Sequence, residues 1–426
     1  MKTFREYDTY LISNVLQLAH VFENFGDVSM ENYELDLAWY YTAPGPAWGA
    51  LLKLTKAELE LIIYPEMLLM IEEGIRGGVS MISTRYAKAN NKYMKEYVKS
   101  LPSIFIPYLD TNNLYGWGMS QKLPIGGFDW ALKEEISNGN WRNIKGGYFA
   151  EVDLGYGKHL HDLYNDYPLT PERKKVNNVD KPIPNLHNKT KYVLHHEVLK
   201  FHEKPGLEFT KIHRVIKFEE TEWMKPYIML NAKLRAQATN DFKKDFFKLM
   251  NNFVFGKTIE NIRNRVDVQL VTSEEELRKL ILKPNYQGWK KFSNNFIAVH
   301  MKKTHLIFNK PTYVGMSILD LAKLHMYDFH YNYIKPKNGD RTKLLFTDTD
   351  SLMYAIQTDD FYKDIASDVL EKFDTSNYPK NHPSGIVTDF NKKVIGMFKD
   401  EAGGQQISKF VGLRAKLYAY LIDNWE

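Results

Sequence analysis

The chain has 426 residues, of which 44% are hydrophobic, 14% aromatic and 26% charged, and its formal net charge is +5. This length and composition predict a folded protein of two or three domains, or one large elaborated domain, and exclude a small scaffold and a disordered chain. The absence of cysteine excludes disulfides, thiolate zinc sites, iron–sulfur clusters and cysteine nucleophiles, and it fits a reducing compartment.

No membrane span or signal peptide is expected. The best apolar stretch, residues 59–71, is interrupted by Glu60, Pro65 and Glu66. The first eight residues contain two acidic side chains where a signal peptide would need an apolar run. We therefore expect an intracellular protein, in the nucleus or cytoplasm of a host cell, without a membrane partner.

Positive charge is concentrated in two windows. Residues 171–217 contain 11 Lys and Arg against 5 Asp and Glu, and residues 233–265 contain 8 against 3. Either window alone would be an ordinary solvated face. Two of them in one chain, together with a compact acidic motif at residues 348–350, favour a channel for a polyanion.

Two elements are predicted in the first quarter of the chain. Apolar residues recur at helical spacing from Tyr10 to Phe25, which predicts a helix. The short apolar run at residues 103–109 is rich in β-formers and predicts a buried strand that delivers Asp110 at its end.

A long helix is predicted from about residue 240 to Asn261, with Thr239, Asn240 and Asp241 as candidate N-caps. Its apolar residues at helical spacing, predicted to face the core, are Phe242, Phe246, Leu249 and Phe253.

A second face of this helix combines a cation, an amide and an aromatic ring. Lys248, Asn252 and Phe255 are spaced i, i+4, i+7, and Gly256 follows where a ligand or backbone could approach closely. Such a face can hold a triphosphate by the ammonium group and a base or sugar by the ring. The alternative, given equal weight, is a solvent-facing lysine beside core aromatics.

Residues 343–346 and 352–356 are strand-like and are joined by a polar segment that contains Asp348 and Asp350, so a hairpin with carboxylates at its tip is predicted. Asp110 and Asp350 each follow an apolar run, and such aspartates suit a shared Mg²⁺ site. An Asx-type turn is the alternative for Asp348. Repelling carboxylates buried side by side need a cation, which favours the metal site.

Three segments in the order A, B, C resemble the motifs of family B DNA polymerases. Residues 110–116 resemble D-x-x-S-L-Y-P, residues 248–256 resemble K-x-x-x-N-S-x-Y-G, and residues 346–351 resemble Y-x-D-T-D-S. Residues 416–418 resemble the K-x-Y primer-contact motif, and residues 76–78 resemble the Gly-Gly element between exonuclease and polymerase regions. The resemblance covers nearly the whole chain.

This resemblance implies an α/β (α+β) right-hand polymerase with palm, fingers and a partial thumb, preceded by a remnant of an RNase H-like exonuclease domain. It implies template-directed DNA synthesis, with nucleotides transferred from dNTPs to a primer 3′-hydroxyl or to a priming-protein hydroxyl. Asp110, Asp350 and the Thr111 carbonyl would bind two Mg²⁺ ions, with Mn²⁺ as an alternative, and Asp348 would support them.

The resemblance also assigns the remaining contacts. Tyr115 would be the steric gate against ribonucleotides, and the nucleotide-binding residues would be Leu114, Tyr115, Lys248, Asn252, Phe255 and Gly256. The DNA-binding residues would be Gly77, Gly78, Thr349, Ser351, Lys416 and Tyr418.

Within the family, the sequences of residues 112–117 and 255–258 most resemble those of the protein-primed viral and transposon-borne branch, as in Maverick/Polinton elements. The 132 residues between Tyr115 and Lys248 and the 89 between Gly256 and Phe346 leave room for the two insertions of that branch. The basic window at 171–217 lies in the first gap, where a terminal priming protein or DNA would be contacted.

The resemblance implies a division of the chain into seven segments. These are residues 1–60 for the end of an exonuclease-like domain, 61–100 for a connector with Gly77 and Gly78, 101–230 for the first palm part with its basic insertion, 231–265 for a fingers helix, 266–340 for a second insertion and palm, 341–400 for the palm hairpin and 401–426 for the start of a thumb.

Several positions depart from the family pattern. Asn113 and Gly116 replace Ser and Pro, Phe346 replaces Tyr, and Phe253 replaces a small Ser. The apolar row that Phe253 forms with Phe246 and Leu249 favours a packing role for it in the core, and the alternative is a side chain that leans toward the incoming nucleotide. In the segment that resembles the third exonuclease motif, Asn14 stands in place of the metal-binding Asp. Proofreading is therefore not expected. The chain is expected to be a fragment or a decayed copy of a mobile-element gene.

The sequence has three further features that bear on function. Residues 256–258 mimic the tail of a P-loop, but Asn251 stands where the motif needs Gly, which excludes it. A catalytically dead remnant that only binds DNA or a priming protein stays open. His195, His196 and His202 fit no standard metal spacing and are predicted to be surface histidines.

Overall fold

The computed structural model describes residues 4–137, 139, 141, 144–176, 178–203 and 206–423. Its helices are α1 (Phe4–Tyr33), α2 (Pro44–Thr55), α3 (Pro65–Gly74), α4 (Leu114–Met119), α5 (Lys133–Ser137), α6 (His161–Tyr164), α7 (His196–Glu203), α8 (Lys225–Gln237), α9 (Asp241–Thr258), α10 (Glu274–Ile281), α11 (Thr312–Asp328), α12 (Lys335–Asn338), α13 (Phe361–Ile365) and α14 (Val369–Lys372).

Its strands are β1 (Ser80–Ile82), β2 (Tyr86–Lys88), β3 (Ile104–Phe105), β4 (Tyr108–Thr111), β5 (Leu123–Trp130), β6 (Gly147–Gly155), β7 (Glu172–Val176), β8 (Val179–Ile183), β9 (Lys189–His195), β10 (Glu208–Thr221), β11 (Val266–Val271), β12 (Tyr286–Ser293), β13 (Phe296–Lys302), β14 (Thr342–Asp348), β15 (Ser351–Gln357), β16 (Phe373–Asp374), β17 (Phe398–Asp400), β18 (Gln406–Arg414) and β19 (Leu417–Asp423).

A seven-stranded sheet carries the predicted acidic residues. Its order is β1-β14-β15-β4-β17-β16, with β3 also paired to β15. The hairpin predicted from residues 343–356 is present as β14 and β15. The strand predicted over 103–109 is interrupted at Ile106-Pro107, so β3 and β4 are separate and Asp110 lies within β4 instead of beyond its end. The break is expected because proline has no amide to donate to a ladder.

A second, four-stranded sheet has the order β5-β10-β6-β9. The long helix α11 joins the parts of the molecule, because it packs against α3, α4, α7 and α9 as well as β5 and β9. Most of its side chains are buried, including Met316, Ile318 and Leu319. This helix fixes the position of α9 relative to the sheet that holds Asp110.

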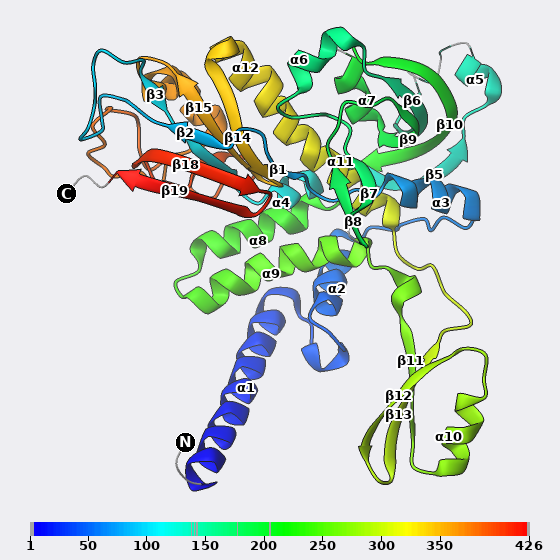
Figure 1. Ribbon diagram of the computed structural model, residues 1–426. Coiled ribbons are helices and arrows are strands. Elements are labelled where there is room, and N and C mark those ends of the chain that lie inside the picture. Colours follow the sequence, from blue (N-terminus) through cyan, green and yellow to red (C-terminus); the bar gives the residue numbers. More distant parts are fainter. Residues whose placement is uncertain are drawn as a thin grey trace.

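The helices α8 and α9 form an antiparallel pair beside the central sheet (Figure 1). Asn240 caps α9 by accepting a hydrogen bond from the Lys243 amide at 2.8 Å, as predicted, but the helix ends at Thr258 and not at Asn261. Leu249, predicted to face the core, is 40% exposed. At about 100° per residue it lies between the polar face at Lys248 and the buried face at Phe246.

Two elements project from the body in Figure 1: helix α1, and the three-stranded β11-β13-β12 sheet with α10. The helix predicted at residues 10–25 is confirmed within α1. Tyr10, Val15 and Leu18 in this helix are more than half exposed. Phe25 packs against the core, with its ring centroid 4.6 Å from that of Phe246. None of the helices in the described part of the chain is both long and apolar enough to cross a bilayer.

Candidate active site

Asp110 on β4 lies next to Asp350, which is in the turn between β14 and β15. Asp110 on β4 is directly beside Ser351 on β15, and the Thr111 amide donates to the Asp350 carbonyl at 2.7 Å. Burial raises the pKa of Asp110 to about 7, and the charges of Asp350 and Glu401 add to this effect. Burial, with the charges of Asp348 and Glu401, also raises the pKa of Asp350. The two carboxyl groups therefore form a site of strong negative potential.

The hairpin tip is held in a strained turn that presents Asp350. Thr349 has a φ of 65°, and the Asp350 amide donates to the Asp348 carbonyl at 2.8 Å. The Thr349 amide donates to the Val79 carbonyl at 2.8 Å, which ties the turn to the segment that contains Gly78. Asp348 is paired with Lys416, whose Nζ lies 3.2 Å from its carboxylate. Asp348 is therefore neutralised from the β18–β19 hairpin.

A cavity of about 540 Å³ opens beside the two aspartates. It brings together eight residues singled out in the sequence: Asp110, Thr111, Leu114, Tyr115, Lys248, Asn252, Phe255 and Asp350. The other lining residues are Asn112, Asn113 and Arg235. Carboxylates therefore stand on the sheet side of one cavity, and cationic and amide groups stand on the α8–α9 side.

Arg235 was missed as a site residue in the sequence. It lies on α8, the helix before the predicted one, and its Nε is buried without a hydrogen-bond partner. The basic window at 233–265 contains it, so the charge pattern was the available signal. Only the antiparallel packing of α8 on α9 brings it to the cavity with Lys248.

Tyr115 and Phe255 form an aromatic stack in this cavity. Their ring centroids are 4.4 Å apart and the rings are 12° from parallel. Tyr115 follows Asp110 on α4 and Phe255 is on α9, so the stack connects the two halves of the site. Burial and the charge of Asp350 raise the pKa of Tyr115. The tyrosine therefore stays uncharged beside the acidic pair.

The two departures in the first motif are coupled to each other. Asn113 has a φ of 48°, and its side chain caps α4 by accepting from the Gly116 amide at 3.2 Å. A Cβ at Gly116 would lie 2.2 Å from the Asn113 side-chain nitrogen, so no other residue fits at 116 while Asn113 keeps this position. Asn113 and Gly116 therefore start α4 with an asparagine cap in place of the Ser and Pro of the family pattern, and Asp110 is unchanged.

The remaining predicted residues do not line the cavity. Gly256 faces open space, and Ser351 is buried in β15. Tyr418 on β19 packs on Phe346, with ring centroids 4.2 Å apart, and its hydroxyl lies 3.2 Å from that of Tyr108. The β18–β19 hairpin, which carries Lys416, therefore packs on Phe346 through Tyr418.

Gly78 lies against the hairpin tip and allows a sharp test. A Cβ at Gly78 would lie 2.4 Å to 2.8 Å from three side-chain atoms of Thr349, whereas a Cβ at Gly77 would have no neighbour within 4 Å. We expect Gly78→Ala to destabilise the protein by about 1–3 kcal/mol through overpacking, and to displace the turn that presents Asp350. Gly77→Ala should behave like the unmodified protein. Urea unfolding of both variants measures this, and equal effects would contradict it.

Phe253 does not line the cavity, and it packs against the core cluster that contains Phe246. Its side chain is half-buried. We expect Phe253→Ser to lower stability, by less than the roughly 3–5 kcal/mol of a fully buried phenylalanine, and to leave nucleotide binding unchanged. Melting temperature and dNTP titration of this variant check both parts. A stable variant with tighter nucleotide binding would place Phe253 in the nucleotide site instead.

The prediction of surface histidines is wrong. His195, His196 and His202 are 1%, 3% and 1% exposed. Burial lowers the pKa of His202 to about 3 and that of His195 far below its usual value. The error arose because the histidines at the end of β9 and on α7 are packed against β6 and α11, which the local sequence does not reveal.

The fold is similar to that of Phi29 DNA polymerase. Its orthorhombic crystal form has a TM-score of 0.54 and 14% identity, with 90% of this chain and 56% of that chain covered. Its ternary complex with primer-template DNA and incoming nucleotide has a TM-score of 0.54 and 16% identity at the same coverage. Its complex with single-stranded DNA has a TM-score of 0.53 and 15% identity, with 90% and 55% covered.

The chain thus spans a little over half the length of that polymerase. No protein-family profile matches the chain, and no curated protein does. The expected mixed α/β architecture is confirmed as a fold that resembles part of a DNA polymerase.

Proposed function

We propose that this chain carries the nucleotidyl-transfer centre of a DNA-directed DNA polymerase. The observation that carries the proposal is the cavity in which Asp110 and Asp350 face Lys248 and Arg235. Such an arrangement suits a triphosphate, because cations can neutralise its phosphates while carboxylates hold the ions at its reacting end. The likeness to the fold of Phi29 DNA polymerase supports the same assignment.

The donor set fits Mg²⁺. Asp110 and Asp350 supply carboxylate oxygens, the Thr111 carbonyl is a further candidate ligand, and hard oxygen donors are what Mg²⁺ prefers in proteins. Burial and the charge of Asp350 raise the pKa of Asp110, and a bound cation would favour the ionised carboxylates. Two Mg²⁺ ions, or Mn²⁺, bound there would supply charge neutralisation at the attacking and leaving oxygens. Asp348, paired with Lys416, keeps the hairpin tip in place.

The residues of the chain then have distinct tasks. Lys248, Arg235 and Asn252 bind and orient the triphosphate from the α8–α9 side, with Leu114, Phe255 and Gly256 beside it. Tyr115 fills the space that a ribose 2′-hydroxyl would need. Contacts to DNA are assigned to Gly77, Gly78, Thr349, Ser351, Lys416 and Tyr418, which surround the cavity.

The finer assignment is to the protein-primed viral and transposon-borne branch of family B, of the Maverick/Polinton kind, with the domain boundaries given above. The described residues from 4 to 55 form α1, a short 3₁₀ turn at Leu37–Trp39 and α2, and α2 packs on α8 and α9. The β11–β13 sheet occupies the proposed second insertion. A terminal priming protein is assigned to the basic first insertion, which includes the β7–β8 hairpin.

Primer extension tests the proposal. The purified chain with a primed single-stranded DNA template, dNTPs and Mg²⁺ is expected to extend the primer according to the template sequence. A chain that binds this DNA but adds no nucleotide with either Mg²⁺ or Mn²⁺ would contradict catalysis and leave a DNA-binding remnant.

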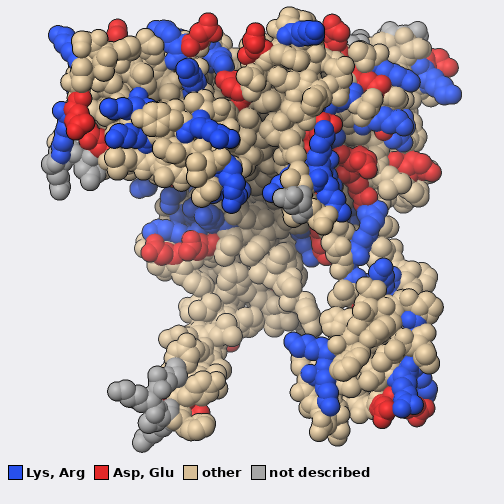
Figure 2. All heavy atoms as spheres, in the orientation of Figure 1, with Lys and Arg blue, Asp and Glu red and all other residues tan. Residues whose placement is uncertain are grey.

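DNA binding should depend steeply on salt. Figure 2 shows Lys and Arg side chains over the β7–β8 hairpin beside the hollow of this face, and Lys174 and Lys181 are cross-strand neighbours there. We expect the logarithm of the affinity for primer-template DNA to fall linearly with the logarithm of salt concentration. Each Lys→Ala change at Lys174 or Lys181 should make the slope less negative by about 0.9.

Lys53→Ala is the matched control for these changes. Lys53 is paired with Glu34 at 2.9 Å and lies outside both basic windows. Its variant should keep the original slope. Fluorescence anisotropy across a salt series measures all of these slopes, and a salt-independent affinity would contradict a polyanion channel.

A further inference from the structure

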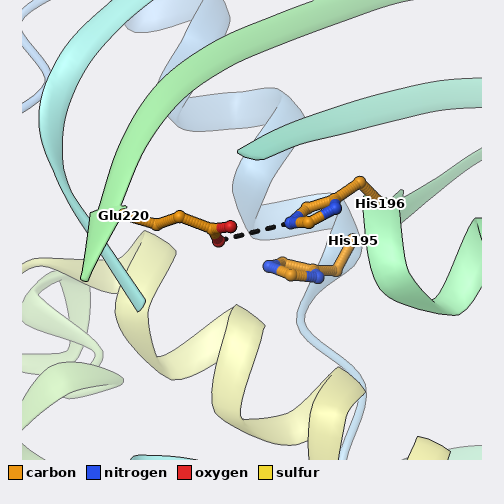
Figure 3. A group of neighbouring side chains, drawn as sticks. All are labelled: His195, His196 and Glu220. Carbon is orange, nitrogen blue, oxygen red and sulfur yellow. Dashed lines mark hydrogen bonds and ion pairs between the residues drawn. The ribbon is translucent and has the colours of Figure 1, made fainter. Parts of the chain in front are cut away.

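Two histidines and a glutamate meet in the four-stranded sheet, and none of them lines the cavity described above. His195 ends β9, His196 begins α7 and Glu220 lies near the end of β10. One nitrogen or oxygen of each side chain lies within 4.8 Å of the others. Figure 3 shows the far ring nitrogens of both histidines on the side that faces the Glu220 carboxylate.

The Nε2 atom of His195 has no hydrogen-bond partner, although its side chain is almost completely buried. The His195 amide donates to the Asp320 carboxylate at 3.0 Å, which fixes the backbone of this residue. An unsatisfied buried ring nitrogen is costly, so a partner at this point would stabilise the fold. The Glu197 amide donates a long hydrogen bond of 3.3 Å to Nδ1 of His195. This bond is lost if Nδ1 carries the ring proton.

His196 is held in the manner of a metal ligand. Its Nε2 lies 3.3 Å from a Glu220 oxygen, and its Nδ1 lies 3.2 Å from a Glu197 oxygen. A carboxylate on the outer nitrogen of a histidine orients the ring and raises the basicity of the inner nitrogen. An ion pair between a charged His196 and these two glutamates would explain His196, but it leaves Nε2 of His195 without a partner.

We propose that His195, His196 and Glu220 bind one Zn²⁺ ion, which joins the β9–α7 junction to β10. Two imidazoles and one carboxylate form a donor set typical of zinc with water in the fourth position. Zinc–nitrogen bonds of about 2.0–2.1 Å place tetrahedral ligand atoms roughly 3.3 Å apart. His196 Nε2 and the Glu220 oxygen already have this separation, so the approach needed is mainly that of His195. In a chain without cysteine, histidine and carboxylate are the ligands available for zinc.

The test uses the full chain with Asp110→Asn and Asp350→Asn, so that the proposed Mg²⁺ site does not contribute. After removal of metals with a chelator, Zn²⁺ alone is titrated by calorimetry, and the melting temperature is measured with and without Zn²⁺. One equivalent of Zn²⁺ should bind and raise the melting temperature. Absence of stoichiometric binding, or an unchanged melting temperature, would overturn the proposal.

Matched variants locate the ion. His195→Gln and Glu220→Gln remove ligands and should weaken Zn²⁺ binding by at least about 100-fold, while Glu197→Gln should weaken it by about 10–100-fold through its contact with His196. Glu197 is 45% exposed, so its variant should fold even if a ligand variant does not. His202→Gln changes a buried histidine outside the cluster and should bind Zn²⁺ like the parent. Unchanged affinity in Glu197→Gln and Glu220→Gln would place the ion elsewhere.

Discussion

Replacing Asp110 or Asp350 by asparagine is expected to abolish nucleotide incorporation while leaving DNA binding nearly intact. Either change removes a carboxylate from the partly buried pair at β4 and the β14–β15 turn and so weakens metal binding. Loss of several kcal/mol of transition-state stabilisation corresponds to a rate loss on the order of 10³-fold or more. DNA affinity should stay because phosphate contacts come from cationic and neutral donors, which carboxylates do not supply.

Primer extension and a gel shift on the same preparations measure the two effects together. Asp359→Asn is the matched control, because Asp359 is exposed and lies two residues beyond the end of β15. It should retain the activity and the affinity of the unmodified chain. Extension by Asp110→Asn or Asp350→Asn at the original rate would contradict the two-metal assignment.

Replacing Tyr115 by alanine is expected to admit ribonucleotides. The Tyr115 ring lies in the cavity between Asp350 and Phe255, and it is stacked on Phe255 at 4.4 Å. Because the proposed gate acts by filling space, loss of the ring should lower the discrimination between dNTP and rNTP by at least about tenfold, or 1.4 kcal/mol. Single-nucleotide incorporation with dNTP and rNTP in parallel measures the ratio.

Tyr115→Phe separates the ring from its hydroxyl. This variant keeps the stack on Phe255 and should keep the discrimination of the unmodified chain. If Tyr115→Ala discriminates as well as Tyr115→Phe, the gate lies on another residue of the cavity.

Local sequence was sufficient for the elements that carry the site. Two strand-like apolar runs joined by a polar segment predicted the β14–β15 hairpin, because strands that are covered by the rest of the fold are rich in apolar residues. Helical spacing predicted that Lys248, Asn252 and Phe255 share one face, and all three line the cavity. The pattern of aspartates after apolar runs predicted that Asp110 and Asp350 would meet. The hairpin and the helix face are set by local interactions, whereas Asp110 and Asp350 meet because β4 pairs with β15.

Only the tertiary structure decided which faces of the helices and strands are covered by segments distant in the sequence. Arg235 reaches the cavity because α8 packs on α9, and Gly78 matters because Thr349 folds onto it. The histidines at 195 and 196 are buried because β6 and α11 pack against them, although their local sequence is that of a polar surface. Conversely, most of the apolar row of α1 is exposed, although its last residue, Phe25, packs on Phe246. Burial is a property of distant segments brought together, so residue spacing along one segment could not supply it.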